Sequence, residues 1–217
     1  SNGGGSYGFI IATSHGQRLV KGSGMAPGAN ANSFRSEAYG VLATMRWYSR
    51  AFNAFHLTGN HTIDHYLDNQ SVITRIQQSP RHSIAFPNQR LLPEQDVIDE
   101  IVNTIRQLST TISIKWVKGH QDATHDFNQL TLPAQLNCEA DKQATAFAVN
   151  HNYHSLTVIP LPHTPVALQV HHRSITGHIK FRVREAASIP HYNLYLRQKF
   201  QWDEDVIQMI DWTTYSS

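Results

Sequence analysis

The sequence predicts an α/β fold with a mixed β-sheet flanked by helices. Short stretches rich in β-branched and aromatic residues alternate with segments whose apolar residues recur at helical spacing. Over the first 150 residues these patterns follow the order strand, strand, helix, strand, helix, helix, strand, helix. The composition suits a packed core, because 40% of the 217 residues are hydrophobic and only 16% are charged.

The first three elements are a hairpin and a long helix. Residues 7–13 and 17–23 are rich in β-forming side chains, and the Ser-His-Gly turn between them predicts a β-hairpin. In residues 34–52 the apolar positions are spaced by three, four and seven, which predicts a helix. Asn32 or Ser33 can cap the N-terminus of this helix.

The remaining elements of this part alternate between strands and helices. Residues 62–67 predict a strand and residues 70–77 a short helix. Pro93 is expected to begin a helix that runs to about residue 108 and carries acids in its first turns, where the helix dipole favours them. A strand at 111–117 and a final helix at 133–149 complete the predicted order.

The character of the sequence changes near residue 150. We expect residues 1–150 to form one domain and residues 151–217 to form a linker and a C-terminal extension, because prolines follow residue 150 without a clear hydrophobic period. In the extension, residues 166–170 are a candidate strand, and 179–187 and 191–200 are candidate short helices. The extension is too small to predict an independent domain.

Charge and cysteine content restrict the class of protein. The formal net charge is only +2, which by itself does not indicate a nucleic-acid-binding protein. The single cysteine, Cys138, excludes an internal disulfide framework and any cysteine-based zinc site. No apolar run reaches the roughly 18 residues needed to span a bilayer. We therefore expect an intracellular protein that does not enter the membrane.

The densest basic stretch lies in the extension, set among histidines. Two interpretations stay open for it: a track that binds nucleic acid, and the polar face of a short helix. Its basic residues are Arg173, Lys180, Arg182 and Arg184.

Three carboxylates lie where the predicted elements would bring them together. Glu37 lies close to the apolar stripe of the first long helix, so its side chain is expected to point toward the sheet. Asp68 follows a strand at its C-terminal end, where open α/β sheets bind ligands. Asp141 lies in the last helix, one turn after Asn137 and on the same face.

Each carboxylate also has a purely structural interpretation. Glu37 could pair with Arg35 or Arg46. Asp68 could cap the helix that follows it. Asp141 could be a solvated helix residue. The conjunction of the three acids favours a shared site over three separate structural roles.

Four segments occur in the order found in one enzyme family. They are SFRSEAYGVLA (33–43), YLDNQSVI (66–73), IKWVKGHQD (114–122) and LNCEADKQA (136–144). Together they resemble the ribonuclease H family over about residues 7–150, and retroelement reverse transcriptases carry such a domain. The tail segment KFQWDEDVIQMIDW (199–212) is weakly similar to an extension found after that domain in some of these proteins.

The resemblance implies a metal-dependent endonuclease that hydrolyses the RNA strand of RNA–DNA hybrids. Glu37, Asp68 and Asp141 would hold two Mg²⁺ or Mn²⁺ ions, because hard divalent ions prefer carboxylate oxygens and two such ions can stabilise phosphodiester hydrolysis. His120 would assist water activation or product release. The chain would be covalently part of a reverse transcriptase polyprotein. The candidate substrate-binding residues are Asn137, Lys118, Asn69 and Lys115.

The chain departs from the family pattern at its beginning. The family's first catalytic aspartate lies on a strand before the hairpin partner that residues 7–13 represent, and only residues 1–6 precede that segment here. We therefore expect an N-terminally truncated domain whose parent protein is the nuclease. The alternative is a catalytically inactive module that binds nucleic acid or tethers a reverse transcriptase.

The loop after the last predicted strand offers a competing metal site. Four potential ligands follow one another there, although no fixed element sets their spacing. They are His120, Asp122, His125 and Asp126.

Overall fold

The chain folds as a mixed α/β protein in two compact units, residues Ser1–Gly177 and His178–Ser217. The structure is a computed structural model. It describes residues 5–28, 32–57, 61–79, 92–150, 160–164, 168–170 and 173–209. Within these ranges, no helix is both long and apolar enough to cross a membrane.

The predicted hairpin is confirmed at the start of the first unit. Strands β1 (Gly5–Ala12) and β2 (Arg18–Ala26) pair antiparallel, with an irregularity in register between Ile11 and Ala12. Gly16 in the connecting turn has a φ of 87°, a conformation that glycine adopts without steric cost. The first strand begins earlier than expected, because Gly5 and Ser6 already pair with β2.

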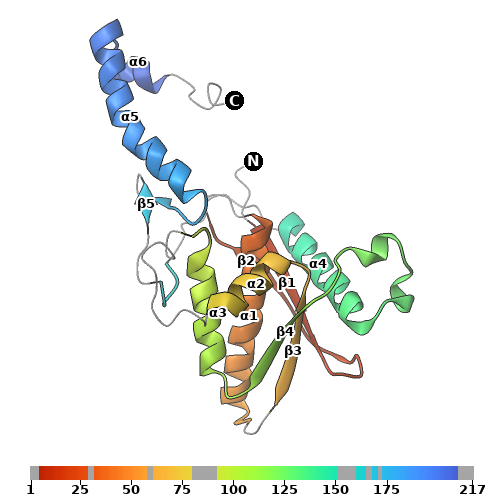
Figure 1. The fold of residues 1–217 in the computed structure, drawn as a ribbon. Helices are drawn as coiled ribbons and strands as arrows, with labels where there is room; N and C mark the ends of the chain where they lie inside the picture. Colours follow the sequence, from red (N-terminus) through yellow and green to blue (C-terminus); the bar gives the residue numbers. More distant parts are fainter. Residues whose placement is uncertain are drawn as a thin grey trace. The chain divides into compact units, whose positions relative to one another are not determined.

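A parallel strand pair forms the edge at which the acids gather. Strands β3 (Thr62–Leu67) and β4 (Thr111–Trp116) pair in parallel, so Leu67 lies opposite Trp116 and both strands end at the same edge (Figure 1). The ladder continues past the strand ends, since the backbone N–H of Val117 donates to the carbonyl of Leu67 at 3.0 Å. The residues after both strands are thereby held close together.

The expected single mixed sheet is not formed in the described part of the chain. The strands there make three two-stranded sheets, β1 with β2, β3 with β4, and β5 (Gln169–Val170) with β6 (Arg173–Ser174). Both antiparallel and parallel pairing are present, as predicted, but no ladder joins β1 to β3. The strand that the family resemblance would place between them has no counterpart among the described residues, so the two pairs lack a shared neighbour.

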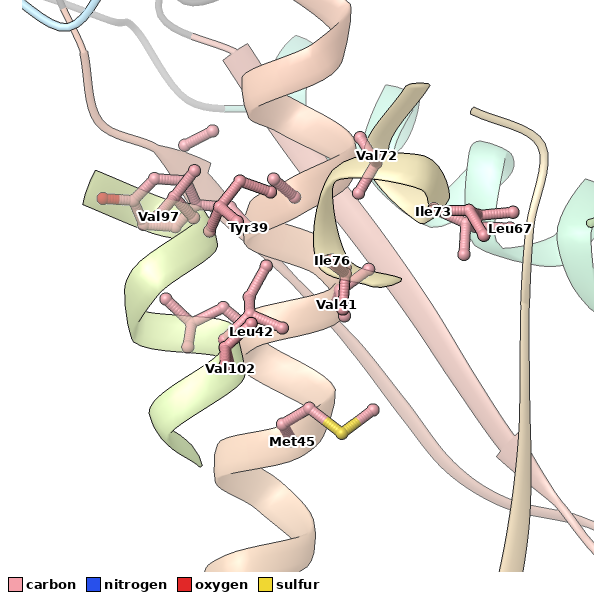
Figure 2. Packing of buried hydrophobic residues seen from close by; sticks show 14 of the residues in the cluster. Tyr39, Val41, Leu42, Met45, Leu67, Val72, Ile73, Ile76, Val97 and Val102 are labelled. Carbon is pink, nitrogen blue, oxygen red and sulfur yellow. The ribbon is translucent and has the colours of Figure 1, made fainter. Parts of the chain in front are cut away.

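The described part of the first unit also contains the helices α1 (Ser33–Ala54), α2 (Gln70–Gln78), α3 (Gln95–Gln107) and α4 (Leu132–Asn150), close to their predicted positions. Asn32 caps α1 as predicted, because its side-chain oxygen accepts from the backbone N–H of Arg35 at 2.8 Å. Figure 2 shows the apolar side chains of α1, α2 and α3 converging in one core. The largest fully buried apolar side chains among them are Val41, Leu42, Met45, Val72, Val97, Ile98 and Ile101.

A buried arginine pairs with acids at the start of α3, which begins later than Pro93. The Arg35 side chain is fully buried, donates to the carbonyl of Pro27 and forms ion pairs with Glu94 and Asp96. Glu94 has a left-handed backbone conformation with a φ of 60°, which is incompatible with a regular first helical turn. The helix therefore starts at Gln95, and the predicted start was wrong by two residues.

In the second unit, the described residues form α5 (Ile179–Phe200) and α6 (Glu204–Gln208). The prediction of two short helices was wrong, because α5 continues through Pro190. Proline removes one backbone hydrogen bond, but its fixed φ is compatible with a helix that is long on both sides. Asp203 caps α6 by accepting from the backbone N–H of Val206 at 2.9 Å.

Candidate functional site

Three carboxylates from three separate elements meet at the edge where β3 and β4 end. Glu37 comes from α1, Asp68 follows β3, and Asp141 comes from α4; we call these residues the carboxylate cluster. One ligand atom each of Asp68, Asp141 and His120 lies within 4.8 Å of the other two. Glu37 interacts electrostatically with both aspartates. The four residues that the resemblance implies as catalytic are therefore brought together.

The backbone around Asp68 fixes its position. The indole Nε1 of Trp116 donates to the carbonyl of Asp68 at 2.9 Å, and so ties the end of β4 to the residue after β3. The backbone of Gly119 lies directly against the carboxylate, since a Cβ at this position would be 2.2 Å from Asp68 Oδ2. Only glycine fits at this approach without displacing the acid.

Burial and mutual repulsion make the cluster costly to ionise. Burial raises the pKa of Glu37 to about 7, and the charges of Asp68 and Asp141 act in the same direction. Burial likewise raises the pKa of Asp141 to about 6, with Asp68 adding to the shift and His120 opposing it. Such a cluster favours either bound protons or bound cations at neutral pH.

The structural interpretation of Glu37 is wrong. Arg35 pairs with Glu94 and Asp96 rather than with Glu37. Arg46 pairs with Glu100 at 2.6 Å. Neither arginine therefore neutralises Glu37.

The structural interpretation of Asp68 is also wrong. Asn69, not Asp68, caps α2, because its side-chain oxygen accepts from the backbone N–H of Val72 at 3.2 Å. The carboxylate of Asp68 is therefore not used as the cap of this helix. Asn69 was predicted to bind substrate, and the structure shows its oxygen engaged in the cap instead.

His120 and Asp141 lie at the solvent-facing side of the cluster. His120 Nδ1 is 3.7 Å from Asp141 Oδ2, and the side chains are 83% and 36% exposed. His120 has a φ of 52° in the loop before a short 3₁₀ turn, Gln121–Ala123. The imidazole is thus next to a cluster carboxylate and accessible to a ligand from solution.

The loop does not form the competing metal site in the part of the chain that the structure describes. Asp122 pairs with Lys142 at 3.2 Å, and His125 Nδ1 is 2.8 Å from the hydroxyl of Thr124. His120 instead approaches Asp68 and Asp141, the one group of metal-ligating side chains found among the described residues.

The other predicted substrate-binding residues have different surroundings. Lys115 pairs with Asp64 at 2.8 Å, and its ammonium lies 5.7 Å from the centre of the Tyr66 ring. Lys118 is exposed in the loop that carries His120. The side-chain Nδ2 of Asn137 is buried and has no hydrogen-bond partner among the described residues. A substrate contact by Lys115 would require it to leave Asp64, whereas Lys118 is already exposed.

Sequence reasoning missed two residues that shape the site, Trp116 and Gly119. Trp116 is the last residue of β4 and is 55% exposed, and its indole donates to the carbonyl of Asp68. Gly119 could have been found from the V-K-G-H segment, because a glycine just after a strand indicates that the backbone approaches another group closely.

No protein-family model matches the chain, and no curated protein is significantly similar to it.

Proposed function

We propose that this chain is the ribonuclease H-like part of an enzyme that hydrolyses the RNA strand of RNA–DNA hybrids, as in retrotransposon-type reverse transcriptases. The observation that carries the proposal is the convergence of Glu37, Asp68 and Asp141, from three elements far apart in sequence, beside His120. Their order along the chain and the elements that carry them agree with the family resemblance.

The donor set of the cluster suits hard divalent cations. Carboxylate oxygens are the ligands that Mg²⁺ and Mn²⁺ prefer, and the raised pKa values of Glu37 and Asp141 reflect how unfavourable the unneutralised charges are. Glu37, Asp68 and Asp141 would hold two Mg²⁺ or Mn²⁺ ions. Such ions stabilise the charge that develops on the phosphate and on the leaving 3′-oxygen.

The protein's own groups would position the substrate and move the proton. His120 is placed to hold a proton at its imidazole beside Asp141, either for activation of water or for release of the product. Lys118, in the same loop as His120, is exposed and would contact a phosphate of the substrate. Recognition of a hybrid rests on 2′-hydroxyl and phosphate contacts rather than on base edges.

The two separate strand pairs support a further part of this proposal. A strand from outside the described residues would pair with β1 and β3, join the two sheets and bring a fourth carboxylate to the cluster. Strand edges without partners are unfavourable. Among the described residues, the buried Nδ2 of Asn137 also has no hydrogen-bond partner, and such a strand could supply one.

Cleavage of a labelled RNA–DNA hybrid with Mg²⁺ or Mn²⁺ tests the proposal. Three proteins are compared: this chain, the chain extended at its N-terminus by a strand that carries one aspartate, and the extended chain with Asp141→Asn. We expect the extended chain to cut only the RNA strand and the Asp141→Asn variant to lose this activity. An extended chain that folds and never cuts the hybrid would contradict the nuclease proposal.

The second candidate is an inactive nucleic-acid-binding or tethering module. It is favoured by the observation that the described residues supply three acids to the cluster and no fourth. Binding of the hybrid by the extended chain with no cleavage in either metal would support this candidate.

A further inference from the structure

One side of α5 carries basic, aromatic and polar residues at helical spacing. The residues recur at intervals of four, four, three, four and four, which places them on one face of the helix. We call this the basic face of α5; it consists of Lys180, Arg184, Ser188, His191, Tyr195 and Lys199, all exposed. It extends from Lys180 to Lys199, a rise of about 28 Å along the helix.

The charge of the helix is strongly positive where the whole chain is nearly neutral. The sequence of α5 holds five lysines and arginines and one glutamate, so its formal charge is +4, while the whole chain carries +2. Glu185 pairs with Arg182, and Glu204 of α6 pairs with Arg197, so these acids neutralise arginines that lie off the basic face. The face itself contains no acid and therefore presents its positive charge to solvent.

Aromatic rings lie beside these cations. Tyr195 and Tyr192 stack with centroids 6.3 Å apart and an interplanar angle of 22°. The ammonium of Lys199 lies 5.1 Å from the centre of the Tyr195 ring and 5.5 Å from that of Phe200. Phe181, at the other end of the helix, is 59% exposed, and the two tyrosines are 45% and 49% exposed. About half of the surface of each tyrosine and more than half of that of Phe181 is therefore accessible from solution.

We propose that the basic face of α5, together with the rings of Tyr192 and Phe181, binds single-stranded nucleic acid. Cations that follow the phosphates and exposed rings on which bases stack are the two components of single-strand binding. A single strand fits better than a duplex, because only unpaired bases offer their faces to aromatic side chains. This site is distinct from the carboxylate cluster and does not depend on cleavage by the first unit.

The charge component is tested with the full chain and a fluorescently labelled single-stranded RNA or DNA of mixed sequence. Fluorescence anisotropy gives the dissociation constant at several salt concentrations. We expect Lys180→Gln/Arg184→Gln to weaken binding and to reduce the salt slope by about 1.4, because each phosphate neutralised on a single strand adds about 0.7 to that slope. The matched control, Arg50→Gln/Arg106→Gln, removes the same charge from exposed positions on α1 and α3 and is expected to keep the slope.

The stacking component is tested with Tyr195→Leu and Tyr192→Leu, which keep helix propensity and apolar area. We expect each to weaken single-strand binding by about 5-fold to 150-fold, the range found when one stacked ring is removed. Leu194→Ala, on another side of α5, is the control and is expected to bind normally. Circular dichroism of every variant verifies that the helix content is retained.

Two results would overturn the proposal. One is equal binding by the tyrosine variants and the Leu194→Ala control. The other is the absence of single-strand binding by the full chain, whether the chain binds nothing, self-associates or binds only duplex nucleic acid. Asp141→Asn is expected to bind single strands like the unmodified chain, so failure of the nuclease proposal and failure of this one are distinguishable.

Discussion

Replacement of Glu37 by glutamine is expected to make the metal-free protein more stable at alkaline pH. Burial and two neighbouring aspartates raise the pKa of Glu37 from 4.5 to about 7. A carboxyl whose pKa is raised in the folded state keeps its proton up to a higher pH than it does in the unfolded chain. The free energy of unfolding therefore falls as the pH rises from about 4.5 to about 7, and stays lower above that range.

The size of the effect follows from the shift. Each pKa unit corresponds to about 1.4 kcal/mol, so ionised Glu37 costs the fold about 3 kcal/mol at pH 8 and less than about 1 kcal/mol at pH 5. Glu37→Gln keeps the shape of the side chain and removes this cost. We therefore expect a gain of about 3 kcal/mol at pH 8 and a much smaller gain at pH 5, measured by urea unfolding in the presence of a chelator.

Glu139→Gln is the matched control. Burial acts against ionisation of Glu139, but hydrogen bonds and charge from Arg18 lower its pKa overall. Loss of the Glu139 carboxylate is expected to lower the free energy of unfolding at pH 8. Addition of Mg²⁺ should then stabilise the unmodified protein more than Glu37→Gln, because the variant has lost a ligand. A Glu37→Gln variant that is less stable than the unmodified protein at pH 8, or equally stabilised at pH 5 and 8, would refute this reasoning.

Three further substitutions test other parts of the structure. Arg35→Met leaves the buried carboxylate of Glu94 and the half-buried carboxylate of Asp96 without their cation, and is expected to cost about 3–5 kcal/mol in urea unfolding; a loss below about 1 kcal/mol would contradict the buried network. Burial lowers the pKa of His65 to about 4, so the unfolded chain takes up the proton first and stability is lost as the pH falls from 6.5 toward 4. His65→Leu should remove a decline of about 2 kcal/mol between pH 7.5 and 5, and an unchanged pH profile would show that His65 is not responsible. Gly119→Ala places a methyl group against Asp68 and is expected to weaken Mn²⁺ binding about tenfold or more by calorimetry, while unchanged affinity would disprove the close approach.

Local patterns were sufficient to predict most elements of the first unit. The spacing of apolar residues located α1, and a polar residue before it located the cap at Asn32. The position of Asp68 after β3 correctly placed it at an edge shared with the loop after β4. These features depend on residues that are neighbours along the chain, so they can be predicted from one sequence.

Features set by distant residues could not be predicted in the same way. Glu94 and Asp96 are about sixty positions from Arg35, and no local pattern shows that a charged side chain will be fully buried with them. The exposure of Trp116 depends on its bond to the Asp68 carbonyl across two strands. The continuity of α5 through Pro190 depends on the many helical hydrogen bonds on both sides, which outweigh the one that proline removes.

Binding of Mn²⁺ to this chain tests most directly the central claim that the carboxylate cluster is a divalent metal site. Free Mn²⁺ is measured by electron paramagnetic resonance during titration at pH 7.5, with Mg²⁺ as competitor. We expect saturable binding that Mg²⁺ displaces and that Asp68→Asn/Asp141→Asn abolishes. A control variant, Asp64→Asn, replaces an exposed acid on β3 and is expected to bind Mn²⁺ normally. Absence of binding, or equal binding by the Asp68→Asn/Asp141→Asn variant, would contradict the claim.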